Sequence, residues 1–221
     1  MGTFSQQTEK SDLSSIWEQQ LEPLIAKLRA FPQIRMSTLG PEGTSSEAAA
    51  QYLIAHLPDK QVECTLYPTY EEAFEDLVNN RSNLFIVANA YQGIDQFYMS
   101  LKVRFLLPFV FETPLYGVAA KLRSPWLNKS PLTISTHHAP SSLIPWFLPH
   151  LKKEYELIPA HSTSEAARKV QRGEADLCIT TANACRKYGL EFISRTRRIV
   201  MLWSVFIPEN IKMDKLKKGV S

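Results

Sequence analysis

The chain has 221 residues, of which 44% are hydrophobic and 21% are charged, and its formal net charge at pH 7 is +3. These values are typical of a globular protein with room for one large domain or two smaller lobes. The mild, dispersed charge argues against a nucleic-acid partner. The absence of any run of about 18 apolar residues argues against a membrane span.

The two ends of the chain are polar. Residues 1–12 lack the apolar core of a signal peptide, which predicts a cytoplasmic protein. The basic run at residues 212–218 is expected to be a solvated end. Cys64, Cys178 and Cys185 form no Cys-x-x-Cys pair, so we expect buried thiols and neither disulfides nor zinc ligands.

Hydrophobic periodicity predicts an α/β protein. Residues 15–18 fit a capping box, and the apolar spacing that follows predicts an accessory helix within residues 1–33. From Ile34 onward, strands and helices alternate. The strands are expected at 34–39, 62–67, 84–88, 132–135, 155–158, 176–180 and 199–207, and the helices at 45–57, 69–79, 141–153, 163–172 and 182–188.

The middle of the chain has a different residue pattern. Residues 105–111 and 115–120 are apolar and rich in β-formers, and they read as antiparallel strands. Two α/β halves that flank such a section predict two lobes with a ligand cleft between them. We therefore expect a catalytic or binding unit at 34–207 and a charged tail at 208–221.

The segment from Leu39 to Ala50 is the first candidate site. Gly40, Pro41 and Gly43 allow a tight turn after a strand, and Thr44, Ser45 and Ser46 then open a helix. Hydroxyl side chains at a helix start satisfy backbone N–H groups, and the same N–H groups attract anions. The pattern fits a carboxylate cradle and equally fits an ordinary capped helix.

Two further loops carry polar groups at helix starts, at residues 136–142 and 161–165. Ser162 to Glu165 forms a capping box. His137 and His138 are adjacent and have no third ligand at a suitable spacing, so they predict no metal site. For His137 the sequence leaves two roles open: it is either a proton donor or a structural residue of the loop. Without a phosphate loop, dinucleotide fingerprint or nucleophile elbow, the residues alone indicate a two-lobed binder of a small anion.

The order of these motifs resembles the prephenate dehydratase family. The resemblance runs through residues 39–49, Ile86-Val87, Thr136-His137, 162–167 and 188–190. It implies that family's two-lobed catalytic-domain fold, which is similar to the periplasmic binding proteins of type II. It also implies that prephenate is the substrate.

The departures from the dehydratase pattern concern its reactive motifs. Residues 88–94 lack the Glu-Asn-Ser triplet that dehydratases carry after the third strand. Their Thr-Arg-Phe motif, whose threonine is taken to assist departure of the ring hydroxyl, corresponds to residues 201–203 in one register and to Thr196-Arg197 in another. Only residues 207–221 follow Phe206, too few for the regulatory domain usual in dehydratases.

A closer resemblance is to the small prephenate decarboxylases of bacilysin-type and aeruginosin-type pathways. It is carried by residues 40–47, 91–99, 162–170, 186–190 and 203–204. It implies a non-aromatising decarboxylation, in which prephenate loses carbon dioxide, a ring carbon takes up a proton and the ring hydroxyl is retained. No cofactor is implied, because the ring diene itself accepts the electrons.

Site residues follow from this resemblance and from the chemistry of two carboxylates. The expected catalytic residues are His137, Tyr98 and Arg104. The expected substrate-binding residues are Thr44, Ser45, Ser46, Asn89, Tyr91, Thr136, Ser162, Thr163, Ser164, Thr180, Trp203 and Ser204. The expected partner is prephenate alone, without nucleic acid or membrane, and a homodimer is left open.

Two other functions remain open on the sequence. One is a prephenate dehydratase that uses Thr196-Arg197 and forms phenylpyruvate. The other is a non-catalytic sensor of an anionic metabolite.

Overall fold

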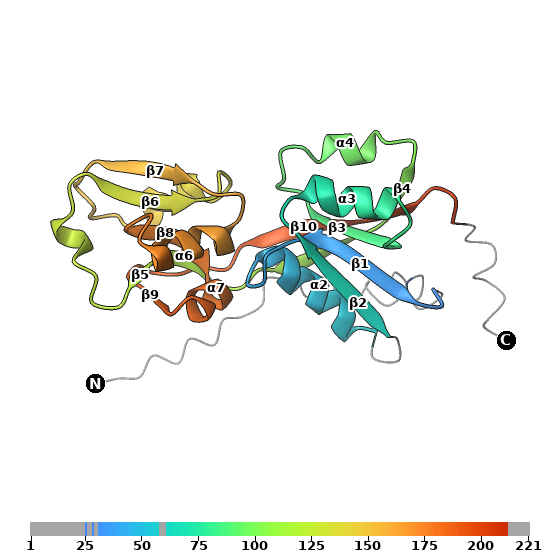
Figure 1. The fold of residues 1–221 in the computed structure, drawn as a ribbon, viewed down its shortest axis with the longest axis horizontal. Helices are drawn as coiled ribbons and strands as arrows, with labels where there is room; N and C mark the ends of the chain where they lie inside the picture. Colours follow the sequence, from blue (N-terminus) through green and yellow to red (C-terminus); the bar gives the residue numbers. More distant parts are fainter. Residues whose placement is uncertain (1–24, 26–27, 29–30, 58–60, 212–221) are drawn as a thin grey trace.

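A computed structural model of the chain describes residues 25, 28, 31–57 and 61–211 and shows two lobes, each built on a five-stranded sheet (Figure 1). In the first lobe the strand order is β2-β1-β3-β10-β4, with β1 at Ile34–Leu39, β2 at Val62–Tyr67, β3 at Leu84–Ala88, β4 at Val103–Glu112 and β10 at Val200–Pro208. In the second lobe the order is β7-β6-β8-β5-β9, with β5 at Tyr116–Lys121, β6 at Leu132–Thr136, β7 at Tyr155–Pro159, β8 at Leu177–Thr181 and β9 at Leu190–Phe192.

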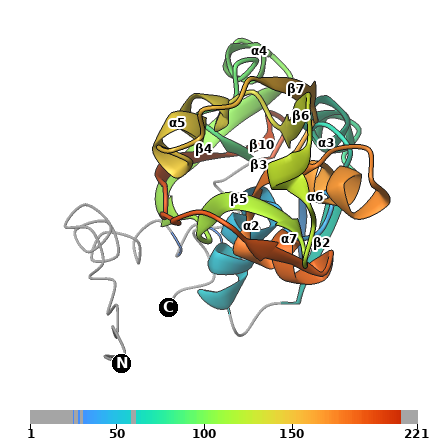
Figure 2. The ribbon, with the colours of Figure 1, turned by 90° about the vertical axis from the view of Figure 1, so that its left-hand side faces the viewer.

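Within residues 61–211, the chain passes between the lobes twice. It leaves the first lobe after β4 and returns along β10, which runs antiparallel between β3 and β4. The lobes follow one another along the longest axis of the molecule, so the second lobe lies in front of the first in Figure 2. The predicted α/β fold with two lobes is confirmed.

Helices cover both faces of each sheet. The first lobe carries α2 at Ser45–Ala55, α3 at Tyr70–Val78 and α4 at Asp95–Tyr98, and the second carries α5 at Ile144–Phe147, α6 at Thr163–Arg172 and α7 at Ala182–Lys187, with short 3-10 turns at Trp126–Asn128 and Ser141–Leu143. In the first lobe, Phe85 contacts Phe97 of α4 on one face of the sheet. On the other face, Trp203 stacks on Phe109, which in turn stacks on Tyr52 of α2.

Most predicted elements agree with the structure to within about three residues, but the helix expected at 141–153 is wrong. The α-helix there ends at Phe147, and Leu148 adopts φ −122° and ψ 65°. Pro149 follows Leu148, and a residue before proline is driven out of the helical region by steric clash. The short elements α4 and β9 were not predicted, because three or four residues give no periodic signal.

The predictions for the two ends fall largely on residues outside the described part. Within it, Ile25 and Leu28 are helical and buried in the core of the first lobe. The division of the chain at residues 34 and 207 stays a prediction. Cys178 and Cys185 are buried and Cys64 is partly buried, and all three are free thiols, as expected. None of the described helices has the length and apolar character needed to cross a bilayer.

The turn between β1 and α2 fastens the two lobes together. The Ser164 hydroxyl donates to the carbonyl of Glu42 at 2.6 Å, and the Thr181 hydroxyl donates to the carbonyl of Gly43 at 2.6 Å. Lys187 also pairs with the carboxylate of Glu42. Gly43 has φ +92°, and a Cβ there would lie 3.0 Å from the Ala184 backbone. The close approach of the lobes therefore needs glycine at residue 43.

Replacing this glycine by alanine tests whether the close contact between the lobes adds to the cost of placing a non-glycine residue at a positive φ. We expect Gly43→Ala to lower the free energy of unfolding by about 2–4 kcal/mol, because it adds a steric clash to a positive φ. Gly189 is the matched control, since its φ is +63° and nothing lies within 4 Å of an added Cβ. Gly189→Ala should cost only about 1 kcal/mol. Equal losses for the two variants in urea unfolding would contradict this role of Gly43.

Candidate active site

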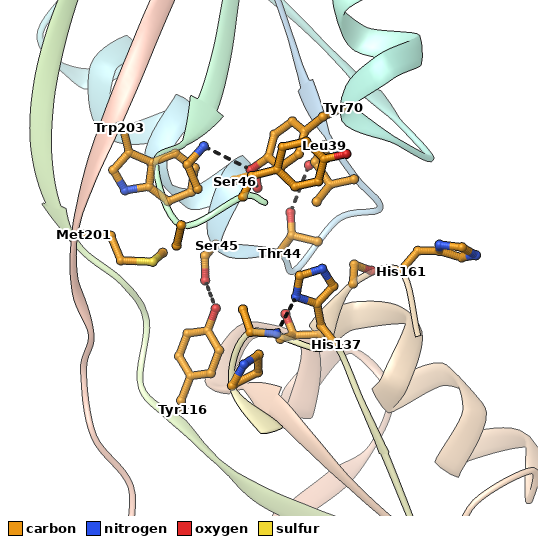
Figure 3. Close-up of a pocket in the computed structure, with 17 residues that line it drawn as sticks. Leu39, Thr44, Ser45, Ser46, Tyr70, Tyr116, His137, His161, Met201 and Trp203 are labelled. Atoms are coloured by element: carbon orange, nitrogen blue, oxygen red, sulfur yellow. Dashed lines mark hydrogen bonds between the residues drawn. The ribbon is translucent and has the colours of Figure 1, made fainter. Parts of the chain in front are cut away.

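A cavity lies between the lobes, where the turn after β1 meets the second sheet (Figure 3). Its empty space is about 530 Å³ including the part open to solvent. Its lining residues are Leu39, Thr44, Ser45, Ser46, Tyr70, Ala88, Ala90, Tyr91, Tyr116, His137, Ala139, Pro140, His161, Ser162, Thr163, Met201 and Trp203. A second hollow continues from it past Glu71 and His138.

Helix α2 begins at this cavity. The Thr44 hydroxyl caps the helix by accepting the N–H of Glu47 at 3.2 Å, and the Glu47 carboxylate accepts the N–H of Gly43 at 2.6 Å. The amides of the first turn ahead of Glu47 have no partner within the helix. They leave a partial positive charge at the edge of the cavity.

Helix α6 of the other lobe begins at the same cavity. Ser162 accepts the N–H of Glu165 at 3.0 Å, and the Glu165 carboxylate accepts the N–H of His161 at 2.8 Å. The capping box predicted at residues 162–165 is thereby confirmed. Two helix N-termini on opposite lobes thus meet at one small cavity, an arrangement that favours an anion.

Two tyrosines place their hydroxyls next to the serines of α2. Ser45 and Tyr116 share a hydrogen bond of 2.6 Å, and Ser46 and Tyr70 share one of 2.8 Å. The Tyr70 oxygen also accepts the N–H of Ala88 at 3.3 Å. Burial raises the pKa of Tyr70 to about 12 and also raises the pKa of Tyr116. Both phenols are therefore protonated at neutral pH.

His137 lies on the second-lobe side of the cavity. Its Nδ1 atom accepts the N–H of Ala139 at 3.3 Å, and its carbonyl accepts the Thr136 hydroxyl at 2.8 Å. Burial, followed by the charges of His138 and His161, lowers the pKa of His137 to about 4. At neutral pH the imidazole is therefore uncharged, and it carries its proton on Nε2, because Nδ1 accepts a hydrogen bond.

The lining lacks carboxylate, ammonium and guanidinium groups. No Lys, Arg, Asp or Glu side chain is among the lining residues. The ring of His161 points away from the other labelled residues (Figure 3). Within the described part of the chain, no three His, Cys, Asp or Glu side chains gather closely enough to hold a metal ion. Attraction for an anion therefore comes from backbone amides and hydroxyls.

The structure brings together eight of the residues predicted for the site. These are Thr44, Ser45, Ser46, Tyr91, His137, Ser162, Thr163 and Trp203. Thr136, Ser164 and Thr180 are buried directly behind the lining. Ser164 bonds to Glu42, and Thr180 donates to the carbonyl of Thr163 at 2.9 Å, so both support the loops that carry the site.

Four other predicted residues lie away from the cavity lining. Ser204 follows Trp203 on β10, and successive strand residues face opposite sides of a sheet. Ser204 bonds to Tyr98 at 2.5 Å and donates to Asn89 at 2.8 Å, so these three residues form a polar cluster on the far face of the first sheet. Arg104 donates to the carbonyl of Ile211. Their roles in the reaction stay predictions.

The residues that sequence reasoning missed are chiefly Tyr70 and Tyr116. Tyr70 is the first residue of α3, directly after the capping residue Thr69. Tyr116 is the first residue of β5 and is 71 residues from its partner Ser45. Each position sits at the start of an element, but only the folded chain places the two hydroxyls beside α2.

Comparisons with known proteins identify the family. Residues 36–198 match the prephenate dehydratase family. A protein of Planktothrix agardhii (strain NIVA-CYA 126/8) named prephenate decarboxylase is 38% identical over 177 residues, which cover 77% of this chain and 86% of that protein. The chain belongs to the prephenate dehydratase family.

Two solved structures show the same fold at low sequence identity. The prephenate dehydratase of Arthrobacter aurescens, in complex with L-Phe, has a TM-score of 0.64 at 14% identity, and the match covers 80% of this chain and 61% of that longer chain. A periplasmic substrate-binding protein of an ABC transporter from Coxiella burnetii has a TM-score of 0.52 at 11% identity, covering 83% of this chain and 90% of that one. The expected likeness to periplasmic binding proteins is confirmed for the fold.

The lowered pKa of His137 predicts a loss of stability in acid. Below its unfolded pKa of about 6.5, the histidine takes up a proton in the unfolded chain but stays neutral in the folded protein. The free energy of unfolding therefore falls as the pH is lowered from about 6.5 toward about 4. Allowing for partial exposure of the ring, we expect about 2 kcal/mol. Urea unfolding of His137→Gln should show a flatter dependence on pH over this range. Exposed His150 lies outside the cleft, and His150→Gln should keep the wild-type dependence; a flattened curve in that control would contradict the assignment.

Proposed function

We propose that this protein catalyses the decarboxylation of prephenate to a dihydro-4-hydroxyphenylpyruvate, with the ring hydroxyl retained. The observation that carries the proposal is the cavity between the lobes, which combines two helix N-termini with an apolar wall and lacks a charged acid. The relationship to a protein named prephenate decarboxylase supports the same reading.

In this proposal the pyruvyl carboxylate of prephenate binds between the starts of α2 and α6. Thr44, Ser45 and Ser46 offer hydroxyls and amides from one lobe, and Ser162 and Thr163 offer them from the other. Hydrogen bonds to an ionised carboxylate are about twice as strong as bonds between neutral groups. The neutral His137 adds an Nε2–H donor from the side.

The departing carboxylate faces the apolar part of the lining, which comprises Leu39, Ala88, Met201 and Trp203. Decarboxylation disperses the carboxylate charge into the ring, so a dry wall disfavours the reactant more than the transition state. Trp203 is fully buried behind this surface and Tyr91 closes its edge. Thr136, Ser164 and Thr180 hold the loops, while Asn89, Tyr98, Ser204 and Arg104 support β10 from its far face.

Retention of the ring hydroxyl requires that no strong acid protonates it. Thr196 and Arg197, which a dehydratase mechanism would use, are not among the lining residues. Arg197 pairs with the backbone of Tyr116 on the strand edge, and its guanidinium lies 5.5 Å from the Trp146 ring. In the other alignment, residues 201–203 correspond to the Thr-Arg-Phe motif of dehydratases. The side chains that then face the cavity, Met201 and Trp203, are not acids that would protonate the ring hydroxyl.

We place this reaction in the cytoplasm, in the supply of a peptide natural product of the bacilysin or aeruginosin type. Prephenate would be the only partner the reaction needs, with no nucleic acid, membrane or cofactor taking part, and a homodimer is the candidate assembly.

The direct test is NMR analysis of the unquenched reaction with prephenate. We expect release of carbon dioxide and a non-aromatic product that keeps the hydroxyl, because the lining offers that hydroxyl no charged acid. Thr196→Val is the matched variant, since it removes one hydroxyl outside the lining and keeps the side-chain shape. Its kcat should stay within about threefold of wild type.

Each alternative function has its own outcome in this test. Phenylpyruvate formed before any acid treatment, and lost in Thr196→Val, would establish the dehydratase. Thermal stabilisation by prephenate without its consumption would establish the sensor. Either result would overturn the proposed decarboxylation.

A further inference from the structure

The phenol of Tyr116 joins the two lobes inside the cavity. Tyr116 and its partner Ser45 are each 6% exposed, and their oxygens lie 2.6 Å apart. Thr163, at the start of α6, lines the same cavity. The hydroxyl points toward α2 and the middle of the lining residues (Figure 3). A phenol carried by β5 of the second lobe therefore sits at the N-terminus of α2.

The other groups of the lining are poor sources of a proton. His137 is uncharged at neutral pH, because its pKa is about 4. The Tyr91 hydroxyl donates a hydrogen bond to the carboxylate of Glu71, and the ring of His161 points outward. Tyr70 accepts the Ala88 amide and pairs with Ser46 away from the second lobe. Tyr116 is the lining phenol that reaches from the second lobe to a hydroxyl of the first.

We propose that Tyr116 is the catalytic acid that protonates the ring carbon of prephenate, an inference that rests on the proposed function. The bond between the quaternary ring carbon and its carboxylate breaks, and carbon dioxide leaves. The bonding electrons form a new double bond between that carbon and its ring neighbour. The double bond that this neighbour had opens, and its electrons take the phenol proton at the carbon next to the hydroxyl-bearing carbon. The second ring double bond and the hydroxyl stay.

Ser45 partly offsets the cost of burying the brief tyrosinate that this step forms, because its hydroxyl hydrogen-bonds the phenol oxygen. Ser45 is the first residue of α2, so the positive end of that helix acts in the same direction. The phenol regains its proton from solvent after the product has left. The cycle consumes one proton and releases one carbon dioxide, and no oxidant or reductant is needed.

The weakness of this acid explains why the ring would not aromatise. Burial raises the pKa of Tyr116, so the phenol does not protonate an alcohol oxygen to make it a leaving group. The ring carbanion left by decarboxylation is a far stronger base and does take the proton. A weak acid at this place therefore selects carbon over oxygen.

The test compares wild type, Tyr116→Phe and Tyr188→Phe with prephenate in D2O. Tyr188 is partly buried on the second lobe outside the cavity lining, so its variant controls for loss of a phenol hydroxyl. We expect wild type and Tyr188→Phe to place deuterium on a single face of one ring carbon. Tyr116→Phe should lose about 10²–10⁴-fold in kcat, with KM within about threefold, and its residual product should carry deuterium on both faces or be aromatic.

The outcomes separate the two proposals. If wild type forms no non-aromatic decarboxylated product from prephenate, both fall. If wild type reacts but Tyr116→Phe keeps a single deuterated face, at any rate, Tyr116 only positions other groups and the assignment is overturned. Loss of activity together with loss of thermal stabilisation by prephenate would overturn it as well. Retained stabilisation with turnover below detection would support it.

Discussion

The fastening of the turn between β1 and α2 onto the second lobe is the constraint on which the site depends. Among the described residues, the chain crosses between the lobes along the segments that join β4 to β5 and β9 to β10. Such links allow hinge motion by default. The carbonyls of Glu42 and Gly43 accept hydroxyls of α6 and of the residue that caps α7, and Ser45 meets Tyr116. These contacts hold the N-terminus of α2 opposite that of α6, and without that arrangement the cavity would have one anion-binding wall instead of two.

Local physics explains why much of this fold could be predicted. The strand–turn–helix unit from β1 to α2 and the capping box of α6 depend on residues close together in the chain, so their signals survive in the sequence. The helix expected up to residue 153 failed where Pro149 ends it, although that proline is visible in the sequence. The prediction gave more weight to the apolar spacing than to Pro149, whereas in the folded chain the steric clash before this proline ends the helix.

The site was harder to predict because its decisive contacts join distant segments. Thr44, Ser45 and Ser162 were expected from the chemistry of helix starts, and they do meet at the cavity. The pairing of Ser45 with Tyr116 depends on how two lobes dock, which no local period encodes. The same limit explains Ser204: the alternation of β10 turns it away from the cavity, while its neighbour Trp203 lines it.

The uncharged lining has a consequence for catalysis that a basic site would not have. A lysine or arginine beside the departing carboxylate would stabilise the reactant, in which the charge is localised, more than the transition state, in which it spreads into the ring. Such binding energy lowers KM without raising kcat. Helix N-termini hold an anion by amides fixed in place, so they can grip the pyruvyl carboxylate, which keeps its charge throughout, while the apolar wall beside Met201 and Trp203 leaves the other carboxylate unpaired. In the proposed reaction, the ring carboxylate leaves because the ring diene accepts its electrons, and the apolar side of the cavity would favour that loss while the polar side holds the pyruvyl carboxylate.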